Sequence, residues 1–323
     1  MTTNQLLEIK KYAQSIWMDN LRRDIIQCGE LKNLVENQGI TGITSNSSIF
    51  QKAITGNAIY DRDIEAGINR GFSTQNIYES LASEDIRKQS DILHLVYQTT
   101  DGLDGYVSIE VPPTIANHTQ KTIEEARRYF KEIGRGNLMI KIPGTEAGLP
   151  AVEQVISKGI NVNITLLFFV DSYVNTAWAY IRGLEKQAAD GFDISNISSV
   201  ASFFLSRIDS KIDGKIDEKL SKGIDDINLE AKLKSVKGKV AIANAKIAYQ
   251  EYKKIINDKR WQALVDKGAK VQRLLWASTS RKDPSYSDVI YLDELIGADT
   301  VNTLPPVTIE ACAEHCDVDS RVE

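Results

Sequence analysis

Short runs of apolar and β-branched residues recur along the chain, and longer stretches with helical spacing of their apolar positions separate them. Runs of about four to eight such residues are typical of buried strands, whereas apolar residues at intervals of three and four are typical of helices. Eight runs fit the strand pattern: Ser15–Asp19, Ile40–Asn46, Gly105–Val111, Asn137–Pro143, Asn161–Phe168, Ser198–Phe204, Arg273–Ser278 and Thr300–Pro305. The clearest helical stretches between them are Ser73–Thr99, Thr119–Ile133, Ala147–Ser157, Asp171–Asp190 and Val240–Ile256.

The alternation of strands with helices predicts a parallel sheet, because each parallel crossover needs a connection of helix length. Eight strands close a (β/α)8 barrel, and 323 residues are close to the usual size of one. A doubly wound open sheet is the alternative, but no G-x-G-x-x-G follows the first strand and the chain has no P-loop. We therefore expect an α/β protein with a single (β/α)8 TIM-barrel domain over residues 1–323.

One segment departs from the barrel pattern and is rich in Lys and Asp. Ser206–Lys239 shows weak periodicity, which predicts a solvated helical extension between the sixth and seventh strands. Its interleaved acidic residues do not fit nucleic-acid binding. The whole chain has 39 Lys and Arg against 44 Asp and Glu, a net charge of −5 that gives no general attraction to nucleic acid or membranes.

Composition also restricts the location and the kind of site. No apolar run approaches the roughly 18 residues that span a bilayer, and the N-terminus lacks the pattern of a secretory signal. Three cysteines without a CxxC pair argue for a reducing, cytoplasmic location and against a disulfide framework. Three histidines lie far apart, and a cluster of Cys312, His315 and Cys316 lacks a fourth ligand, so we expect no metal site.

Polar residues stand in or near the C-terminal ends of successive predicted strands. The barrel interior is ordinarily filled by Val, Ile and Leu, and active sites lie at this end of the barrel. Several polar residues on one face therefore predict a site there. The strand-end residues are Asp19, Asn46, Glu110, Lys141, Asn163, Thr165, Ser202 and Ser278.

Lys141 carries the strongest single signal because it interrupts the apolar strand LMIKIP. A desolvated lysine has a lowered pKa, so that its neutral amine can attack a carbonyl group and form a Schiff base. The alternative is a lysine that reaches out of the strand end or pairs with a carboxylate for structural reasons.

Two carboxyl groups would complement such a lysine. Glu110, within VSIEV, can shuttle protons during formation and hydrolysis of an imine, or it can simply be the structural partner of a buried lysine. Asp19 can take the hydroxyl proton during retro-aldol cleavage, or it can cap a helix.

The remaining candidates are weaker by themselves. Asn46 ends a cluster of hydroxyl and amide residues that suits a polyol, although such clusters more often form turns. Ser202, Arg207 and Ser278 combine hydroxyls with a guanidinium that could hold a phosphate. Phe204 could line a sugar pocket or belong to the core, and His118 fits a loop or cap.

Several of these stretches together resemble the transaldolase family, most closely its longer bacterial and plant-type branch. They are GITSNSSIF (42–50), VSIEVPP (107–113), NLMIKIPGTEAGLPA (137–151), GINVNITLLF (159–168) and residues 274–306. The resemblance runs from about Tyr12 to the end. It implies a class I aldolase-like barrel that moves a dihydroxyacetone unit from sedoheptulose 7-phosphate to glyceraldehyde 3-phosphate, giving erythrose 4-phosphate and fructose 6-phosphate. This reaction of the pentose phosphate pathway needs no metal or organic cofactor.

The resemblance also implies a role for each matching residue. Lys141 falls on the Schiff-base lysine, Glu110 on the acid that works through a catalytic water, and Asp19 on the base for C–C cleavage. Asn46, Asn163 and Thr165 match the residues that hold the dihydroxyacetone part and the water. Ser202, Phe204 and Arg207 match the sixth-strand pocket and phosphate clamp, and Ser278 matches a seventh-strand phosphate contact. Ser280, Arg281 and Lys282 all lie near the place of a second phosphate-binding arginine.

Two departures from the family pattern keep other hypotheses open. Ser47 stands where the family usually has Pro, which predicts weaker substrate positioning beside Asn46. Only Pro306–Glu323 follows the eighth strand, so a final outer helix is expected to be missing, exposing apolar surface and favouring association into a homo-oligomer. The alternatives are a Schiff-base sugar-phosphate aldolase without a required acceptor, and a truncated inactive barrel with a binding role.

Overall fold

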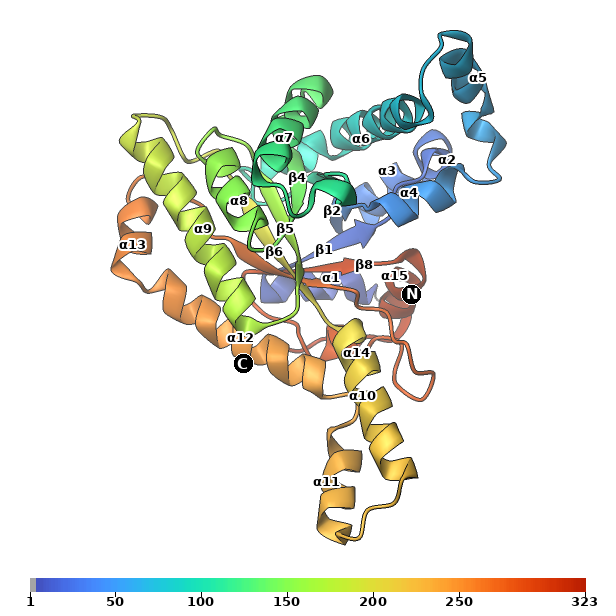
Figure 1. The fold of residues 1–323 in the computed structure, drawn as a ribbon, viewed down its shortest axis with the longest axis vertical. Coiled ribbons are helices and arrows are strands. Elements are labelled where there is room, and N and C mark those ends of the chain that lie inside the picture. Colours follow the sequence, from blue (N-terminus) through green and yellow to red (C-terminus); the bar gives the residue numbers. More distant parts are fainter. Residues whose placement is uncertain (1–3) are drawn as a thin grey trace.

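Eight parallel strands close into a barrel in the computed structural model, which describes residues 4–323 (Figure 1). The strands follow one another around the barrel in chain order, and β1 pairs with β8 to close it. This arrangement confirms the predicted (β/α)8 fold. The strands are β1 (Gln14–Asp19), β2 (Ile40–Thr44), β3 (Val107–Glu110), β4 (Leu138–Pro143), β5 (Val162–Leu167), β6 (Ser199–Phe204), β7 (Arg273–Ala277) and β8 (Thr300–Leu304).

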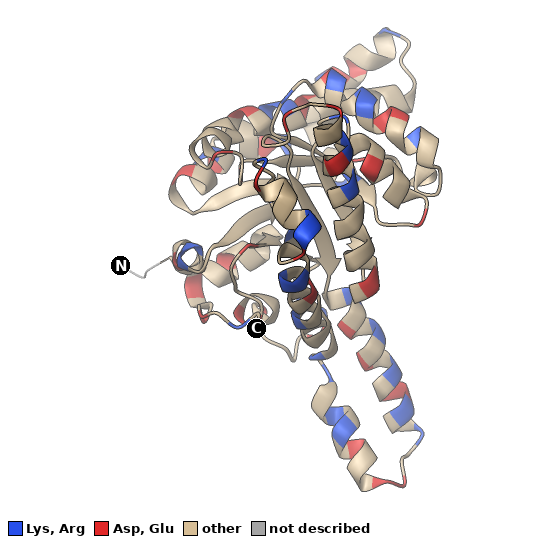
Figure 2. Cartoon of the chain, turned by 90° about the vertical axis from the view of Figure 1, so that its left-hand side faces the viewer, with Lys and Arg blue, Asp and Glu red and all other residues tan. Residues whose placement is uncertain are grey.

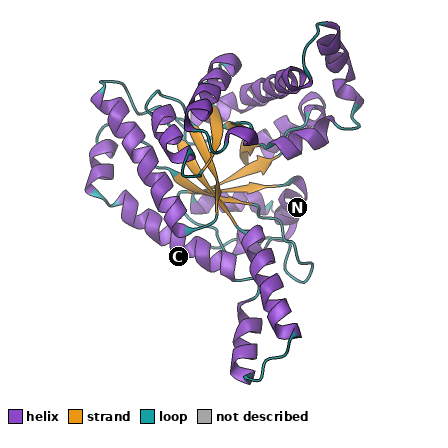
Figure 3. Cartoon of the chain, in the orientation of Figure 1, coloured by secondary structure: helices purple, strands orange, loops and turns teal. Residues whose placement is uncertain are grey.

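Helices surround the strands on all sides (Figure 3). The α-helices are α1 (Gln5–Ile9), α2 (Arg23–Gln27), α3 (Glu30–Asn37), α4 (Ser47–Ile54), α5 (Asp61–Asn69), α6 (Thr74–Thr99), α7 (Thr119–Ile133), α8 (Gly148–Ile156), α9 (Val170–Ala189), α10 (Ser206–Ser221), α11 (Ile227–Val236), α12 (Val240–Ile256), α13 (Lys259–Val265), α14 (Ile290–Asp293) and α15 (Pro306–His315). Short 3₁₀ turns are η1 (Lys10–Tyr12), η2 (Ala58–Tyr60) and η3 (Pro113–Ile115). Each of the five predicted helical stretches coincides with one of these helices to within a few residues. Among the described residues, no helix is both long and apolar enough to cross a bilayer.

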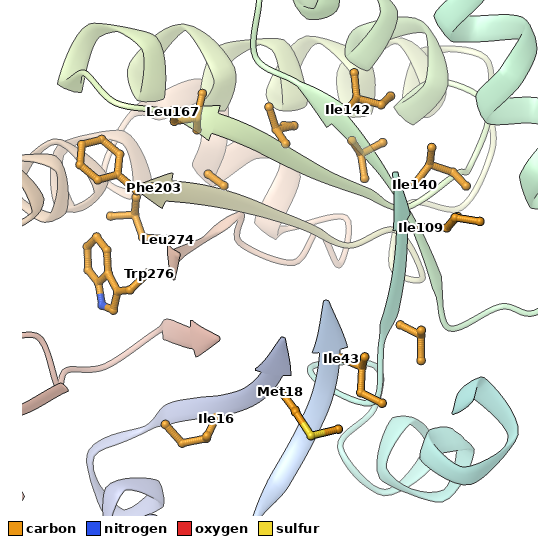
Figure 4. Packing of buried hydrophobic residues seen from close by; sticks show 14 of the residues in the cluster. Ile16, Met18, Ile43, Ile109, Ile140, Ile142, Leu167, Phe203, Leu274 and Trp276 are labelled. Carbon is orange, nitrogen blue, oxygen red and sulfur yellow. The ribbon is translucent and has the colours of Figure 1, made fainter. Parts of the chain in front are cut away.

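Alternate residues of the strands face the helices and form the larger hydrophobic core (Figure 4). Ile16, Met18 and Ile43 come from β1 and β2, and Ile140 and Ile142 from β4, all fully or almost fully buried. Successive side chains of a strand point to opposite faces, so the residues between them point into the barrel. The same alternation therefore fixes which side chains can reach the site.

A second, smaller apolar cluster fills the barrel interior with Trp17, Met139, Val200, Leu275 and Val301 from five different strands. Gly42 lies beside Trp17 in the β1–β2 pairing. A Cβ atom at Gly42 would stand 2.5 Å from the indole ring, so the glycine makes room for the tryptophan. This apolar layer separates the polar residues at the C-terminal end of the barrel from those at its N-terminal end.

A buried ion pair closes the N-terminal end of the barrel. The guanidinium of Arg273 lies 2.9 Å from the carboxylate of Asp104 and donates to the Ser15 hydroxyl at 2.7 Å. The indole N–H of Trp17 donates to the same carboxylate at 2.9 Å. Because every partner in this network is buried, the ions are stabilised by hydrogen bonds instead of water.

The charged segment after β6 forms α10 and α11, which project away from the barrel and carry charges of both signs (Figures 1 and 2). Two buried aspartates in the first half of α10 attach this helix to the rest of the protein. Asp209 accepts hydrogen bonds from the Ala241 backbone and the Tyr291 hydroxyl, both at 2.8 Å. Asp213 accepts from the Tyr286 hydroxyl at 2.9 Å. These contacts tie the start of α10 to the start of α12 and to the segment after β7.

The segment after β8 does form an outer helix, α15, which packs against α1, β1 and β8. Ile309 and Cys312 of this helix are buried. The backbone N–H of Val322 then donates to Ile296 at 3.1 Å, and the Val322 side chain is also buried. Residues 306–323 therefore cover part of the barrel with α15, and the absence of a further outer helix stays a prediction.

Cys312, His315 and Cys316 lie in or directly after α15, whereas His118 lies elsewhere in the fold. Cys312 and Cys316 are free thiols, and His315 pairs with Asp288 at 2.9 Å. His118 occupies the N-cap position of α7. Within residues 4–323, no group of three or more His, Cys, Asp or Glu residues is arranged to hold a metal ion.

Candidate active site

The three strongest sequence candidates meet at the C-terminal end of the barrel. Glu110 on β3 pairs in register with Lys141 on β4, and Lys141 pairs with Asn163 on β5. Lys141 is 7% exposed, and its ammonium donates to the Ser45 carbonyl at 3.3 Å. In the described part of the chain it forms no salt bridge. The alternative of a lysine paired with a carboxylate for structure is therefore not what the structure contains.

Two carboxyl groups surround this lysine. Burial raises the pKa of Asp19 above its ordinary value, whereas Lys141, the Thr44 hydroxyl and Arg207 act in the opposite direction. Burial likewise raises the pKa of Glu110, and the negative charge of Asp19 raises it further. The positive charges of Lys141 and Arg207 lower it. Lys141 is thus close enough to both carboxyl groups to influence their pKa values, and the two carboxyl groups are close to each other.

A row of hydrogen bonds crosses the barrel through Asn163. The Ser202 hydroxyl donates to the Asn163 side-chain oxygen at 2.7 Å, and the Asn163 amide nitrogen donates to the Ser108 hydroxyl at 3.1 Å. Ser202, Asn163 and Ser108 stand on β6, β5 and β3, so the row passes β4, which carries Lys141. The orientation of the Asn163 amide is thereby fixed.

Thr165 offers a free polar group next to that row. Its hydroxyl is buried, and no hydrogen-bond partner for it is present among residues 4–323. The β5–β6 pairing shifts between Ile164 and Leu167, and Leu166 adopts a left-handed φ of 63°. The pairing of β5 with β6 is therefore irregular around Thr165, two residues before the strand ends. An unpartnered buried hydroxyl at such a place suits a ligand or a water molecule.

A second group of candidates lies around the start of α10. The Arg207 guanidinium carbon stands 5.0 Å from the centre of the Phe204 ring, and within the described residues Arg207 forms no salt bridge. Phe168 also packs against Phe204, and the centres of the two rings lie 5.2 Å apart. Ser278 directly follows β7 and has a φ of 57°, and its hydroxyl lies 2.9 Å from that of Ser206. A cation, two hydroxyls and the N-terminus of α10 are suited to a phosphate.

The segment after β7 carries two candidates for a second phosphate-binding cation, Arg281 and Lys282. The Arg281 guanidinium donates to the Tyr286 carbonyl at 2.6 Å and to the Pro284 carbonyl at 3.2 Å. Lys282 donates to the Ser280 hydroxyl at 2.9 Å and is exposed. Arg281 is thus engaged with its own loop, and neither side chain contacts the Ser278 hydroxyl.

Asn46 stands at the edge of the site and caps a helix. Its side-chain oxygen accepts the backbone N–H of Ile49 at 3.0 Å, which leaves its amide N–H groups available. Ser47 begins α4, so the helix starts at this position without a proline. Asn46, Ser47 and Glu110 line a hollow of about 1270 Å³ bounded by α4, α6 and α7.

Three hydroxyl residues of the site have no role of their own in the sequence analysis: Thr44, which belongs to the hydroxyl cluster that ends at Asn46, and Ser108 and Thr303, which it does not single out. Thr44 lies two residues before Asn46, and Ser108 two residues before Glu110, so the alternation along each strand could have found both. Thr303 lies within β8, a strand for which no other candidate was predicted, and no signal in the sequence points to it.

A (β/α)8 barrel that holds a buried lysine near two carboxyl groups at the C-terminal ends of its strands is typical of enzymes that form an imine with a carbonyl substrate. Comparison with known proteins then gives the family. The sequence profile of the transaldolase/fructose-6-phosphate aldolase family matches residues 16–323. The chain belongs to this family, whose function is the transaldolase reaction of the pentose phosphate pathway, and it is thereby an enzyme of the transferase class.

Several curated relatives align with the whole chain. It is 74% identical to "Transaldolase 2" of Nostoc punctiforme and 75% identical to "Transaldolase 2" of a Nostoc species, over all 323 residues in each case. It is 69% identical to "Transaldolase" of Trichodesmium erythraeum. Each alignment covers 85% of the relative's own length.

Proposed function

We propose that this chain transfers a dihydroxyacetone unit from sedoheptulose 7-phosphate to glyceraldehyde 3-phosphate through an imine on Lys141. One observation carries this proposal: Lys141 is buried, is free of any salt bridge in the described chain, and lies between Glu110 and Asn163 on neighbouring strands. A buried primary amine that no ion pair holds in place can reach the carbonyl carbon of a bound substrate, and an amine is the nucleophile that forms an imine.

Each step of the reaction has a residue to assist it. The Lys141 amine attacks the C2 carbonyl carbon of the donor, and the resulting carbinolamine loses water when its hydroxyl receives a proton. The raised pKa of Glu110 favours the neutral carboxyl group that can give this proton, directly or through a water molecule. Imine formation therefore pairs a nucleophile with an acid held beside it.

Cleavage of the C3–C4 bond needs a base on the C4 hydroxyl. Asp19 takes that proton, the C4 oxygen becomes the aldehyde of erythrose 4-phosphate, and the bonding electrons pass to the imine as an enamine. The enamine then adds to the aldehyde carbon of glyceraldehyde 3-phosphate, and Asp19 returns the proton to the new hydroxyl. Hydrolysis of the second imine, assisted by Glu110, releases fructose 6-phosphate.

The other side chains would position the substrate. Asn46, Asn163 and Thr165 supply amide and hydroxyl groups for the dihydroxyacetone part, and Ser202 orients Asn163. Phe204 lines the pocket, and Arg207 with Ser278 would bind the terminal phosphate. These substrates are sugar phosphates. We propose that the enzyme acts on them in the cytoplasm.

Replacing Arg207 with Leu is expected to raise the KM for a phosphorylated donor by about 10- to 100-fold, because a charge-assisted contact to the phosphate is lost. The KM for an unphosphorylated ketose should change by less than about threefold. Arg281→Leu is the matched control, since Arg281 is engaged with its own loop. Steady-state kinetics with both donors measures the difference; equal effects on the two donors would contradict a phosphate-binding role.

A transfer assay separates the proposed function from its two alternatives. With fructose 6-phosphate as donor and erythrose 4-phosphate as acceptor, a transaldolase forms sedoheptulose 7-phosphate much faster than it releases free dihydroxyacetone. A Schiff-base aldolase releases the free triose at a rate that does not depend on the acceptor. Folded protein that shows neither activity would support the inactive, binding role instead.

Self-association into a homo-oligomer also stays a prediction, and size-exclusion chromatography tests it.

A further inference from the structure

We propose that Thr303 and Thr44 are positioning residues that form a hydrogen-bond relay to the carboxylate of Asp19. The inference rests on the proposed role of Asp19 as the base for C–C cleavage. It adds two residues from strands that carry no proposed catalytic group.

The relay runs across three adjacent strands. The Thr44 hydroxyl donates to an Asp19 carboxylate oxygen at 2.8 Å, and the Thr303 hydroxyl lies 2.7 Å from the Thr44 hydroxyl. Thr44 stands on β2 and Thr303 on β8, the two strands that flank β1. Both side chains are buried. The two hydroxyls therefore meet inside the barrel, beside the strand that carries Asp19.

Counting protons gives the relay a direction. A hydroxyl has one proton, so a Thr44 that donates to Asp19 must accept from Thr303. In this direction each hydroxyl proton has an acceptor, and the chain ends on a carboxylate. In the opposite direction a protonated Asp19 donates to Thr44 and Thr44 to Thr303, but residues 4–323 offer the Thr303 proton no further acceptor in the structure. The relay thus stabilises the ionised form of Asp19.

The backbone around Thr303 keeps the relay in place. The Thr279 hydroxyl donates to the Thr303 carbonyl at 2.9 Å, which links the segment after β7 to β8. Thr303 also pairs in register with Trp17, which is held by its own hydrogen bond to Asp104. A hydroxyl on a strand fixed at two points loses little freedom when it donates, so it can hold Thr44 in one orientation.

Burial has the largest influence on the pKa of Asp19, and the relay acts against it. Burial raises the pKa of this carboxyl group, and Lys141, Thr44 and Arg207 each lower it. Glu110 also faces Asp19, and the two carboxyl groups repel when both are charged. A base must be ionised to accept a proton, so a donor chain that ends on Asp19 keeps the base active toward lower pH.

The test separates imine formation from C–C cleavage in one experiment. Enzyme is mixed with fructose 6-phosphate, quenched with borohydride at successive times and analysed by mass spectrometry. The reduced adduct before cleavage carries the six-carbon sugar phosphate, whereas the adduct after cleavage carries three carbons and no phosphate. Thr303→Val removes the hydroxyl at nearly constant volume, Thr303→Ser retains it, and Thr44→Val removes the direct donor.

Thr303→Val is expected to slow conversion of the six-carbon into the three-carbon adduct about 3- to 10-fold at neutral pH, with imine formation changed less than about twofold. The acid limb of its kcat–pH profile should move to higher pH by about half a unit, and that of Thr44→Val by about one unit. Thr303→Ser should restore both. A merely structural role would lower the melting temperature without changing the ratio of adducts.

Asp19→Asn distinguishes failure of the relay from failure of the proposed function. If Asp19→Asn blocks cleavage and Thr303→Val changes neither the adduct ratio nor the acid limb, the relay is overturned and the role of Asp19 stands. If Asp19→Asn cleaves at the wild-type rate, the role of Asp19 and the relay are both overturned. Thr303→Ala replaces Thr303→Val if the latter does not fold, and the same outcomes apply to it.

Discussion

Replacing Lys141 with Met is expected to lower turnover by more than about 10⁴-fold, because no other group at the site can form an imine. Methionine has a similar length and suits the apolar strand around it, so the loss would come from chemistry and not from packing. Lys141→Arg is expected to be equally inactive, since a guanidinium stays protonated and is not a nucleophile.

The control for this substitution is an exposed lysine outside the site. Lys158 lies in the turn after α8 and is solvent-exposed, so Lys158→Met should retain wild-type turnover. Coupled assays at saturating donor measure kcat, and far-UV circular dichroism and thermal melting show whether both variants are folded. Turnover of Lys141→Met within tenfold of the wild type, by folded protein, would contradict the imine mechanism.

Replacing Arg273 with Leu is expected to lower the free energy of unfolding by about 3–5 kcal/mol. The substitution leaves the Asp104 carboxylate buried with no cation, and it removes the donor to the Ser15 hydroxyl. Water cannot replace these contacts at the closed N-terminal end of the barrel, because both Arg273 and Asp104 are almost fully buried. The ion pair therefore matters far more for stability than one at the surface.

The exposed ion pair of Arg260 with Glu185 provides the matched comparison. Its atoms lie 2.7 Å apart, closer than those of Arg273 and Asp104, but the side chains are 50% and 35% exposed. Arg260→Leu should cost no more than about 1 kcal/mol. Urea unfolding of both variants measures the difference, and similar costs for the two substitutions would show that burial does not give the pair of Arg273 and Asp104 its larger effect on stability.

The fold was predictable because apolar residues recur with a different spacing in buried strands than in amphipathic helices. Asn161–Phe168 and Arg273–Ser278 were placed within one residue of the ends of β5 and β7. Gly105–Val111 was too long by two residues at its start, because Tyr106 is apolar and buried without belonging to β3. Strand ends are set by pairing with neighbours, and the sequence of one strand does not contain that information.

The charged candidates were predictable for a related reason. A lysine, a glutamate or an aspartate within an apolar strand is costly unless it has a role, so Lys141, Glu110 and Asp19 stood out. Their places in the barrel agree with the strand ends predicted for them, and their catalytic roles remain proposals. The same argument also identifies Arg273 at the start of β7, although its purpose is structural.

The contact between Thr44 and Thr303 could not be predicted, because Thr is ordinary in strands and carries no charge that must be compensated. Thr44 and Thr303 are 259 positions apart, and only closure of the barrel brings β2 and β8 to either side of β1. Asp209 and Asp213 were hidden in a different way. They resemble the exposed charges around them, but the folded chain buries Asp209 against the starts of α12 and α14, and Asp213 against Tyr286 in the segment after β7.

The central claim is that the donor becomes covalently bound to Lys141. Wild-type protein incubated with fructose 6-phosphate and borohydride should lose activity and gain one reduced sugar adduct per chain. Digestion and tandem mass spectrometry should place that adduct on the peptide that contains Leu138–Pro143, with the added mass on Lys141. An active protein that gives no adduct, or an adduct on another lysine, would contradict the account.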